Sequence, residues 1–220
     1  MGEMFLRPGT PDDDNRDYLP EKIKGSDIVV NENGNNSQPY PERLNEYHGV
    51  IADGLEDEWY VYVPESYDPS VKTPLVVSLH GGMMTGWGQA IYTSWTLASD
   101  RDGFIVLFPN ASYQRFWQVQ WGTWEINPEK LTPGAMEGEP EGVKSCPENV
   151  EDNHDIKLIM GLIEKMKAEY NIDEGRIFMQ GMSMGNMMTA LFARNFGNIL
   201  AGAAGSGAAA FMSLIFDKDE

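Results

Sequence analysis

The residues best suited to chemistry lie in the segment Gly181-Met182-Ser183-Met184-Gly185. A serine with a glycine two positions away on either side, after a strand-like run and before a helix-like run, is typical of a nucleophile elbow. The turn from strand to helix is so tight that side chains at positions 181 and 185 would collide with neighbouring backbone. It exposes the serine hydroxyl at the positive end of a helix, where developing negative charge is favoured. The motif predicts that Ser183 is an attacking nucleophile; the alternative is an ordinary glycine-rich turn with a capping serine.

A second glycine-containing segment, His80-Gly81-Gly82, closes the apolar run PLVVSLHGG. In folds with a nucleophile elbow, the loop at this place supplies one amide of an oxyanion hole, and the residue after the nucleophile supplies the other. This assigns the two amides to Gly82 and Met184. Two such donors are each worth on the order of 3 kcal/mol in the transition state. We interpret His80 as a structural residue that holds the loop, because its position matches the oxyanion strand and not the general base.

The elements that must position these residues alternate along the chain. EWYVYVPE predicts a half-buried strand with Trp59, Val61 and Val63 on its buried face, and PLVVSLHGG and GFIVLFPN predict fully buried strands. A helix is expected over 87–100, and another in EDNHDIKLIMGLIEKMKAEY with Asp152 or Asn153 as its cap. NIDEGR reads as a turn, RIFMQ as a buried strand, NMMTALFARNF as a helix and ILAGAAGSGAAAF as a strand and loop. This order predicts an α/β fold, a mostly parallel sheet with helices on both faces. The elbow motif between a strand and a helix makes the expected fold one of the α/β-hydrolase type.

The composition divides the chain into two parts. Residues 1–47 are rich in Asp, Asn, Gly and Pro, which predicts a polar N-terminal arm or linker with one short strand at Asp27–Val30. Residues 48–220 are predicted to form a partial α/β-hydrolase domain. The whole chain, with 220 residues of which 41% are hydrophobic, is long enough for one sizeable core.

The charge and the rarer residues exclude several classes of function. The 34 acidic residues against 16 basic ones give a formal charge of −18, which argues against nucleic acid as a partner. No stretch reaches the roughly 20 apolar residues of a membrane helix. Three scattered histidines and one cysteine, Cys146, offer no metal-ligand spacing and no internal disulfide. No phosphate loop or dinucleotide fingerprint is present, so we expect neither a metal nor another cofactor.

The motifs resemble a known family. YVYVPESYDPS, PLVVSLHGG, FIVLFPN, AEYNIDEGRIFMQGMSMG and ILAGAAGSGAA together make the chain similar, over roughly residues 55–210, to the polyhydroxybutyrate depolymerase and feruloyl/acetylxylan esterase group. The resemblance implies a secreted hydrolase of ester bonds in polyesters or in the acyl decorations of plant polysaccharides. By the same resemblance, Ser183 is the nucleophile, and Gly82 and Met184 are the oxyanion amides. The N-terminus shows no signal-peptide pattern, so a cytoplasmic location is the alternative to an extracellular one.

The chain departs from this family after the serine. The family's acid and base follow the nucleophile in the order Ser, Asp, His, but 37 residues follow Ser183 here and none is histidine. We therefore expect a piece of a longer esterase that lacks the last strands and has little activity by itself. His154 is the one internal candidate for a substitute base, and a capping or surface role is the alternative for it.

Residues 111–150 form a long loop, which in a compact domain usually serves a function or is disordered. Its Trp117, Trp121 and Trp124 could line a substrate cleft, since aromatic rings stack on feruloyl groups and sugar faces, or they could pack in the interior. The sequence thus predicts a serine carboxylic-ester hydrolase that acts through an acyl-serine intermediate on a polyester or an acylated polysaccharide. A peptidase or acyltransferase on the same scaffold, and a catalytically incomplete carbohydrate-binding remnant, are the alternatives.

Overall fold

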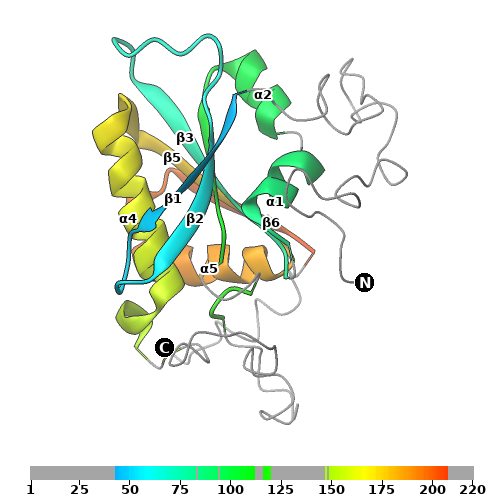
Figure 1. The fold of residues 1–220 in the computed structure, drawn as a ribbon, viewed down its shortest axis with the longest axis vertical. Helices are drawn as coiled ribbons and strands as arrows, with labels where there is room; N and C mark the ends of the chain where they lie inside the picture. Colours follow the sequence, from blue (N-terminus) through cyan, green and yellow to red (C-terminus); the bar gives the residue numbers. More distant parts are fainter. Residues whose placement is uncertain are drawn as a thin grey trace.

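One mixed sheet forms the middle of the molecule. The computed structural model describes residues 43–82, 84–93, 95–111, 116–119, 147 and 149–207. Six strands from these residues pair in the order β1-β2-β4-β3-β5-β6 (Figure 1). The strands are β1 (Leu44–Val50), β2 (Glu56–Tyr62), β3 (Thr73–Leu79), β4 (Ile105–Pro109), β5 (Ile172–Met182) and β6 (Gly202–Ser206). β1, β2 and β4 pair antiparallel, whereas β4, β3, β5 and β6 run parallel, which confirms the predicted mostly parallel sheet.

Helices cover both faces of the sheet, as the alternation of elements predicted. They are α1 (Gly86–Tyr92), α2 (Trp95–Asp102), the 3₁₀ helix η3 (Val150–Asp152), α4 (His154–Glu169), α5 (Met184–Phe196) and the 3₁₀ helix η4 (Gly197–Ile199). In Figure 1, α1 and α2 lie on one side of the sheet and α4 on the other. Two hydrophobic clusters follow this division, one beneath α4 and α5 and a smaller one beneath α1. No helix in the described residues is long and apolar enough to cross a membrane.

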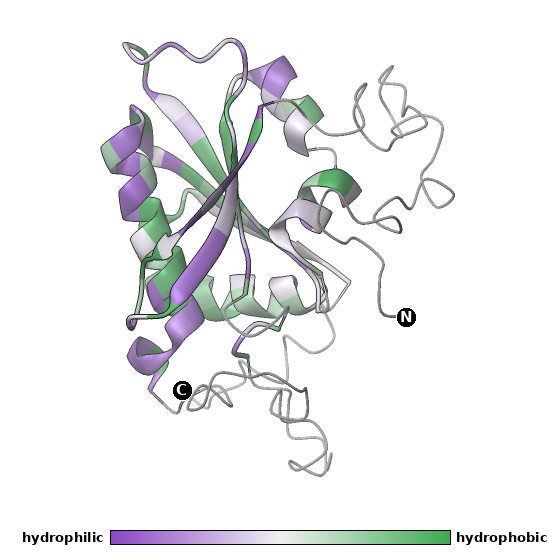
Figure 2. Ribbon diagram, viewed as in Figure 1, coloured by the Kyte–Doolittle hydropathy of each residue, from purple (hydrophilic) through white to green (hydrophobic). Residues whose placement is uncertain are grey.

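The central strand β3 shows why an unbroken apolar run was needed. Leu75, Val77 and Leu79 point into the cluster with α4 and α5, whereas Val76 points into the cluster with α1. Successive side chains of a strand point to opposite faces, so a strand with helices on both faces has to be apolar throughout. Figure 2 shows this as hydrophobic colour along the central strands and mixed hydropathy along α4.

The prediction of a half-buried β2 was wrong. Trp59 and Val61 lie in the larger cluster as expected, but Tyr60 and Tyr62 are also buried, at 1% and 3% exposure. Their rings lie in the cluster beneath α1, and the Tyr62 hydroxyl donates to the Asp100 carboxylate at 2.6 Å. Tyrosine can be buried on its ring while its hydroxyl keeps a polar partner, so alternation with tyrosine does not mark a solvent face.

Three element boundaries also differ from prediction. The boundary expected between residues 47 and 48 falls inside β1, which pairs antiparallel with β2 from Leu44 onward. The helix expected over 87–100 is two helices, α1 and α2. The turn expected at NIDEGR is part of β5, where the pairing with β3 shifts between Thr73↔Ile172 and Leu75↔Ile177. The strand predicted at Asp27–Val30 lies outside the described residues.

Candidate active site

Ser183 stands at a sharp bend between β5 and α5. Its backbone has φ 52° and ψ −115°, in a region that side chains rarely adopt, and its side chain is exposed. Its amide donates to the carbonyl of Ser206 at the end of β6 (2.8 Å). Its own carbonyl accepts from the amides of Asn186 (3.0 Å) and Met187 (3.2 Å) in the first turn of α5. Strained backbone persists only where surrounding contacts hold it, and these bonds do so here.

The two glycines of the motif are required by the close approach of backbone, as the sequence predicted. A Cβ atom on Gly181 would overlap the carbonyl of Gly185. A Cβ atom on Gly185 would overlap the carbonyl of Leu79 and lie 2.5 Å from the carbonyl oxygen of His80. The bend therefore packs directly against the end of β3, and only glycine allows this contact.

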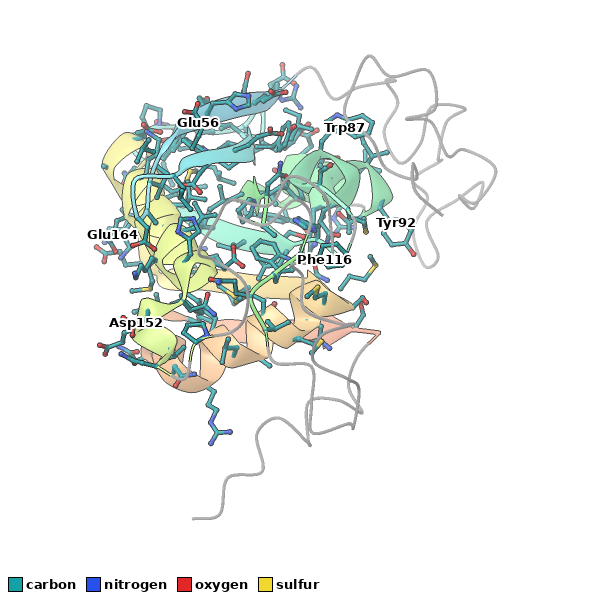
Figure 3. All side chains as sticks on the ribbon, turned by 60° about the horizontal axis from the view of Figure 1, so that its bottom comes forward. Glu56, Trp87, Tyr92, Phe116, Asp152 and Glu164 are labelled. Atoms are coloured by element: carbon teal, nitrogen blue, oxygen red, sulfur yellow. The ribbon has the colours of Figure 1, made fainter. Side chains whose placement is uncertain are left out.

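The residues proposed for the oxyanion hole lie beside this bend. A Cβ atom built on Gly82 would lie 3.5 Å from the Met184 sulfur and 3.6 Å from a ring carbon of Phe116, which Figure 3 labels. Met184 is the first residue of α5, so its amide has no acceptor within the helix. The fold thus brings Gly82, Ser183 and Met184 onto adjacent segments, although about a hundred residues separate the first from the others.

His80 holds the loop at residues 80–82, hereafter the oxyanion loop, from within the core. Its side chain is fully buried, with Nδ1 2.7 Å from the carbonyl oxygen of Gly81. The Ala111 amide donates to its Nε2 at 3.0 Å. Both ring nitrogens therefore have backbone partners, which agrees with a structural role and leaves neither nitrogen to act as a base.

Trp117 does not line an open cleft, so that interpretation is corrected. The side chain is fully buried in the larger cluster, and its ring lies 4.7 Å from that of His80 between centroids. Its indole nitrogen donates to the His80 carbonyl at 2.7 Å. The Trp117 side chain can be fully buried because its indole N–H has a backbone acceptor inside the core. Trp121 and Trp124 lie outside the described residues.

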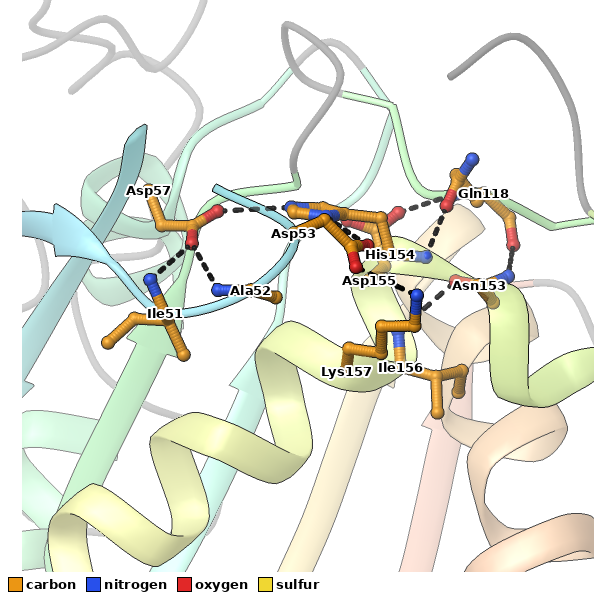
Figure 4. A network of polar contacts seen from close by, with 10 residues as sticks. All are labelled: Ile51, Ala52, Asp53, Asp57, Gln118, Asn153, His154, Asp155, Ile156 and Lys157. Atoms are coloured by element: carbon orange, nitrogen blue, oxygen red, sulfur yellow. Dashed lines mark hydrogen bonds and ion pairs between the residues drawn. The ribbon is translucent and has the colours of Figure 1, made fainter. Parts of the chain in front are cut away.

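His154 does not fit the role of a substitute base. Its side chain is 3% exposed, with Nδ1 3.0 Å from Asp53 and Nε2 3.2 Å from Asp57 (Figure 4). Burial lowers its pKa, but hydrogen bonds to Asp57 and Asp53 and the nearby charge of Asp155 outweigh this, so the pKa of His154 is raised. Both ring nitrogens are engaged by carboxylates, so neither is available to accept the proton of Ser183. His154 is also neither a cap nor a surface residue, the roles expected otherwise.

Sequence reasoning missed the contacts that tie the start of α4 to Gln118. The Asp155 carboxylate accepts from the Gln118 amide at 2.6 Å, and the His154 amide donates to the Gln118 side chain at 2.8 Å. Asn153 donates to the Gln118 carbonyl at 2.8 Å while its Oδ1 caps the Ile156 amide at 3.1 Å. The predicted cap at Asn153 is confirmed. Polar residues in the run NHD were the available signal, but their partner lies some 35 positions earlier in the chain.

A small group of possible metal ligands also depends on strand register. Cross-strand pairing of β1 with β2 brings side-chain atoms of Glu46, His48 and Glu58 within 4.8 Å of one another. The group is on the surface, and His48 is already paired with Glu46 at 2.6 Å. A hydrogen bond between exposed side chains accounts for this arrangement, and we assign no metal to it.

Comparison with known proteins identifies the family to which this chain is similar. The profile described as "Esterase PHB depolymerase" matches residues 59–214. Feruloyl esterase B of Neurospora crassa is 31% identical over 156 residues, which are 68% of this chain and 44% of that protein. The bifunctional acetylxylan esterase/xylanase XynS20E of Neocallimastix patriciarum is 29% identical over 136 residues, 62% of this chain and 16% of that protein.

Solved structures agree on the fold. An acetyl xylan esterase from Aspergillus awamori has a TM-score of 0.53 at 22% identity, over 76% of this chain and 54% of that one. A thermostable esterase has a TM-score of 0.52 at 24% identity, over 80% and 44% of the two chains. The chain thus spans about half the length of these structures and less than half of the curated relatives named above. Because the profile covers most of the sequence and the fold agrees, the chain belongs to the esterase PHB depolymerase family, within the α/β-hydrolase fold.

Proposed function

We propose that Ser183 is the nucleophile of a carboxylic-ester hydrolase. The observation that supports this most directly is the strained, exposed Ser183 at the start of α5, packed through Gly185 against the end of β3. Ser183 Oγ attacks the ester carbonyl, and the carbonyl oxygen becomes an oxyanion that accepts hydrogen bonds from the amides of Gly82 and Met184. Collapse of the tetrahedral intermediate releases the alcohol and leaves an acyl-serine, which water then hydrolyses.

The proton of Ser183 needs a base that the described side chains do not supply. His80 bonds to backbone through both ring nitrogens, His154 lies between two carboxylates, and His48 is paired with Glu46 on β1. A histidine supplied by additional polypeptide would complete the site. We therefore expect slow turnover by this chain alone, because loss of the base removes most of the activation of the serine.

The substrate class is proposed from the relatives. Their names include acetylxylan esterase, feruloyl esterase and poly(3-hydroxyalkanoate) depolymerase. We propose an acylated polysaccharide or a polyester as the substrate, and an extracellular site of action to match such polymers. The formal net charge of −18 suits a neutral polymer better than an anionic one.

A fluorophosphonate probe tests the nucleophile. Because the base is missing, we expect slow labelling of the wild-type chain at Ser183 on prolonged incubation, as located by peptide mass spectrometry, and no label in the Ser183→Ala variant under the same conditions. Absence of label from the folded wild type would instead favour the non-catalytic carbohydrate-binding alternative. If labelling occurs, p-nitrophenyl esters compared with peptide substrates separate an esterase from a peptidase on the same scaffold.

A further inference from the structure

The amide proposed to face the oxyanion belongs to a loop with two consecutive glycines. Gly81 and Gly82 have no side chains that could restrict their backbone. An amide stabilises an oxyanion well only when its direction is fixed before the reaction. Something outside the two glycines must therefore set the orientation of their peptide planes. The contacts of His80 supply such a restraint.

The backbone partners of His80 define which ring nitrogen carries the proton. Nε2 lies 3.0 Å from the Ala111 amide, which can only donate, so Nε2 must be the acceptor. Nδ1 lies 2.7 Å from the carbonyl of Gly81, which can only accept, so Nδ1 must carry the hydrogen. Only the neutral Nδ1–H tautomer satisfies both contacts in the fully buried ring.

The bond from Nδ1 also determines where the next amide points. The described residues contain no cis peptide bond, and in a trans peptide the C=O and N–H point in opposite directions. The carbonyl of Gly81 faces the His80 ring and also accepts from the Met84 amide at 3.2 Å. The N–H of Gly82, in the same peptide plane, is therefore turned away from the ring.

The preceding peptide plane is held in the same manner. The carbonyl of His80 accepts from the Trp117 indole at 2.7 Å and lies close to Gly185 of the elbow. Two successive peptide planes of the oxyanion loop are thus restrained by buried partners. The loop can neither rotate its planes nor leave the elbow without breaking a buried hydrogen bond.

We propose that His80 is a positioning residue, which as the Nδ1–H tautomer holds the Gly81 carbonyl and thereby aims the Gly82 amide at the developing oxyanion. This inference rests on the proposed function of Ser183, Gly82 and Met184. His80 takes no proton in the reaction and touches no substrate. Its effect on the reaction comes from the direction that it imposes on one peptide plane.

Two substitutions distinguish the two hydrogen bonds that the His80 ring makes. His80→Asn places an amide N–H near the position of Nδ1 and keeps a donor for Gly81, whereas His80→Gln places a carbonyl oxygen near the position of Nε2 and keeps an acceptor for Ala111. Each variant loses one hydrogen bond, so their melting temperatures should fall by similar amounts. The second-order rate of fluorophosphonate labelling at Ser183 should fall about 100-fold in His80→Gln, and about tenfold or less in His80→Asn.

Exposed His48 provides the matched control, and His48→Gln should be labelled at the wild-type rate. Equal slowing of both His80 variants, or a larger loss in His80→Asn, would overturn the inference. If the His80 variants do not fold, the wild-type chain still decides the matter, because long-range ¹H–¹⁵N NMR correlations report the ring tautomer. We expect a protonated Nδ1 and a bare Nε2.

The outcomes for the two proposals are distinguishable. A labelled wild-type chain with its ring proton on Nε2 overturns the role of His80 and leaves the proposed function standing. A wild-type chain that carries the Nδ1–H tautomer but is not labelled at Ser183 even on prolonged incubation overturns the proposed function, and with it any catalytic role of this orientation.

Discussion

Single residues at the elbow are explained by local steric constraint, which is why the sequence predicted them. Gly181 and Gly185 stand where any side chain would meet backbone, and Ser183 has the positive φ that such a turn demands. The contact at Gly181 is with Gly185, four positions later, whereas Gly185 meets the distant end of β3 and was predicted because the spacing of the motif is recognisable by itself. The positions of Trp117 and His154 were not predictable in this way, since their partners are 37 and 101 residues away.

Substitution of Gly185 by alanine should destabilise the fold. The new Cβ atom would lie against two carbonyl groups at the end of β3, which are backbone atoms that cannot rotate away. We expect the free energy of unfolding, measured by urea denaturation, to fall by about 3 kcal/mol.

Gly197→Ala is the matched control for Gly185→Ala. Gly197 has φ −63° and open space around its Cβ position, so its replacement should raise stability by about 0.5 kcal/mol. Equal effects of the two substitutions would contradict the steric explanation.

The buried His154 predicts a dependence of stability on pH. Burial is the largest single influence and lowers the pKa, but the hydrogen bonds to Asp57 and Asp53 and the nearby charge of Asp155 together outweigh it, so the folded-state pKa is raised above the ordinary value of 6.5. A raised pKa means that the folded state binds the proton more tightly than the unfolded state. The stabilisation is therefore complete below about pH 6.5 and is lost as the pH rises through the folded-state pKa.

Unfolding free energies of the wild type and His154→Gln, compared from pH 5 to pH 9, test this effect. The advantage of the wild type should shrink as the pH rises. An advantage that is constant or grows with pH would show that the ring is not held as a cation.

At the scale of whole elements, the start of α4 connects the helix to the segment that carries Trp117. Asn153 has two functions there, since it caps Ile156 and donates to the Gln118 carbonyl. Asn153→Ala should lower the unfolding free energy by about 2 kcal/mol, because it removes a cap and leaves a buried carbonyl without its donor. Asn149 caps the exposed η3 in a similar way, and Asn149→Ala should cost less than about 0.5 kcal/mol. Chemical denaturation of both variants makes the comparison, and similar losses would argue against the connecting role.

Apolar periodicity predicted the order of the elements but not all of their limits. β3, β4, α4 and α5 carry long, consistent patterns and were located correctly. The first residues of β5 carry turn-forming residues, yet they pair with β3 across a shift in register. β1 is polar enough to read as part of a linker, and it becomes a strand because β2 offers it a partner. Pairing between strands is a tertiary contact, so a local pattern does not reveal it.

At the scale of the molecule, the part of the sheet that the structure describes is well covered in its middle and exposed near β6. Among the described strands, β6 pairs with β5 alone, and most of its residues are exposed. An apolar groove of about 590 Å³ lies beside it, with Val76, Trp95, Phe104 and Phe178 in its walls. An open strand next to an apolar groove favours association between chains.

We expect this association to depend on salt, because a formal charge of −18 opposes contact between copies until salt screens it. Sedimentation velocity should show larger species as sodium chloride rises from 0.02 to 0.5 M, and Ala204→Lys on β6 should reduce them. Val71→Lys, at an exposed apolar position away from β6, should leave the sedimentation profile as in the wild type. Association that responds equally to both substitutions would locate the contact elsewhere.

The bond between the Ser183 amide and the Ser206 carbonyl links the outermost strand to the reactive residue. Fraying of that strand would remove one of the restraints on the strained serine. A further strand paired with β6 would restrain β6. It would thereby stabilise the backbone of the nucleophile without contacting it.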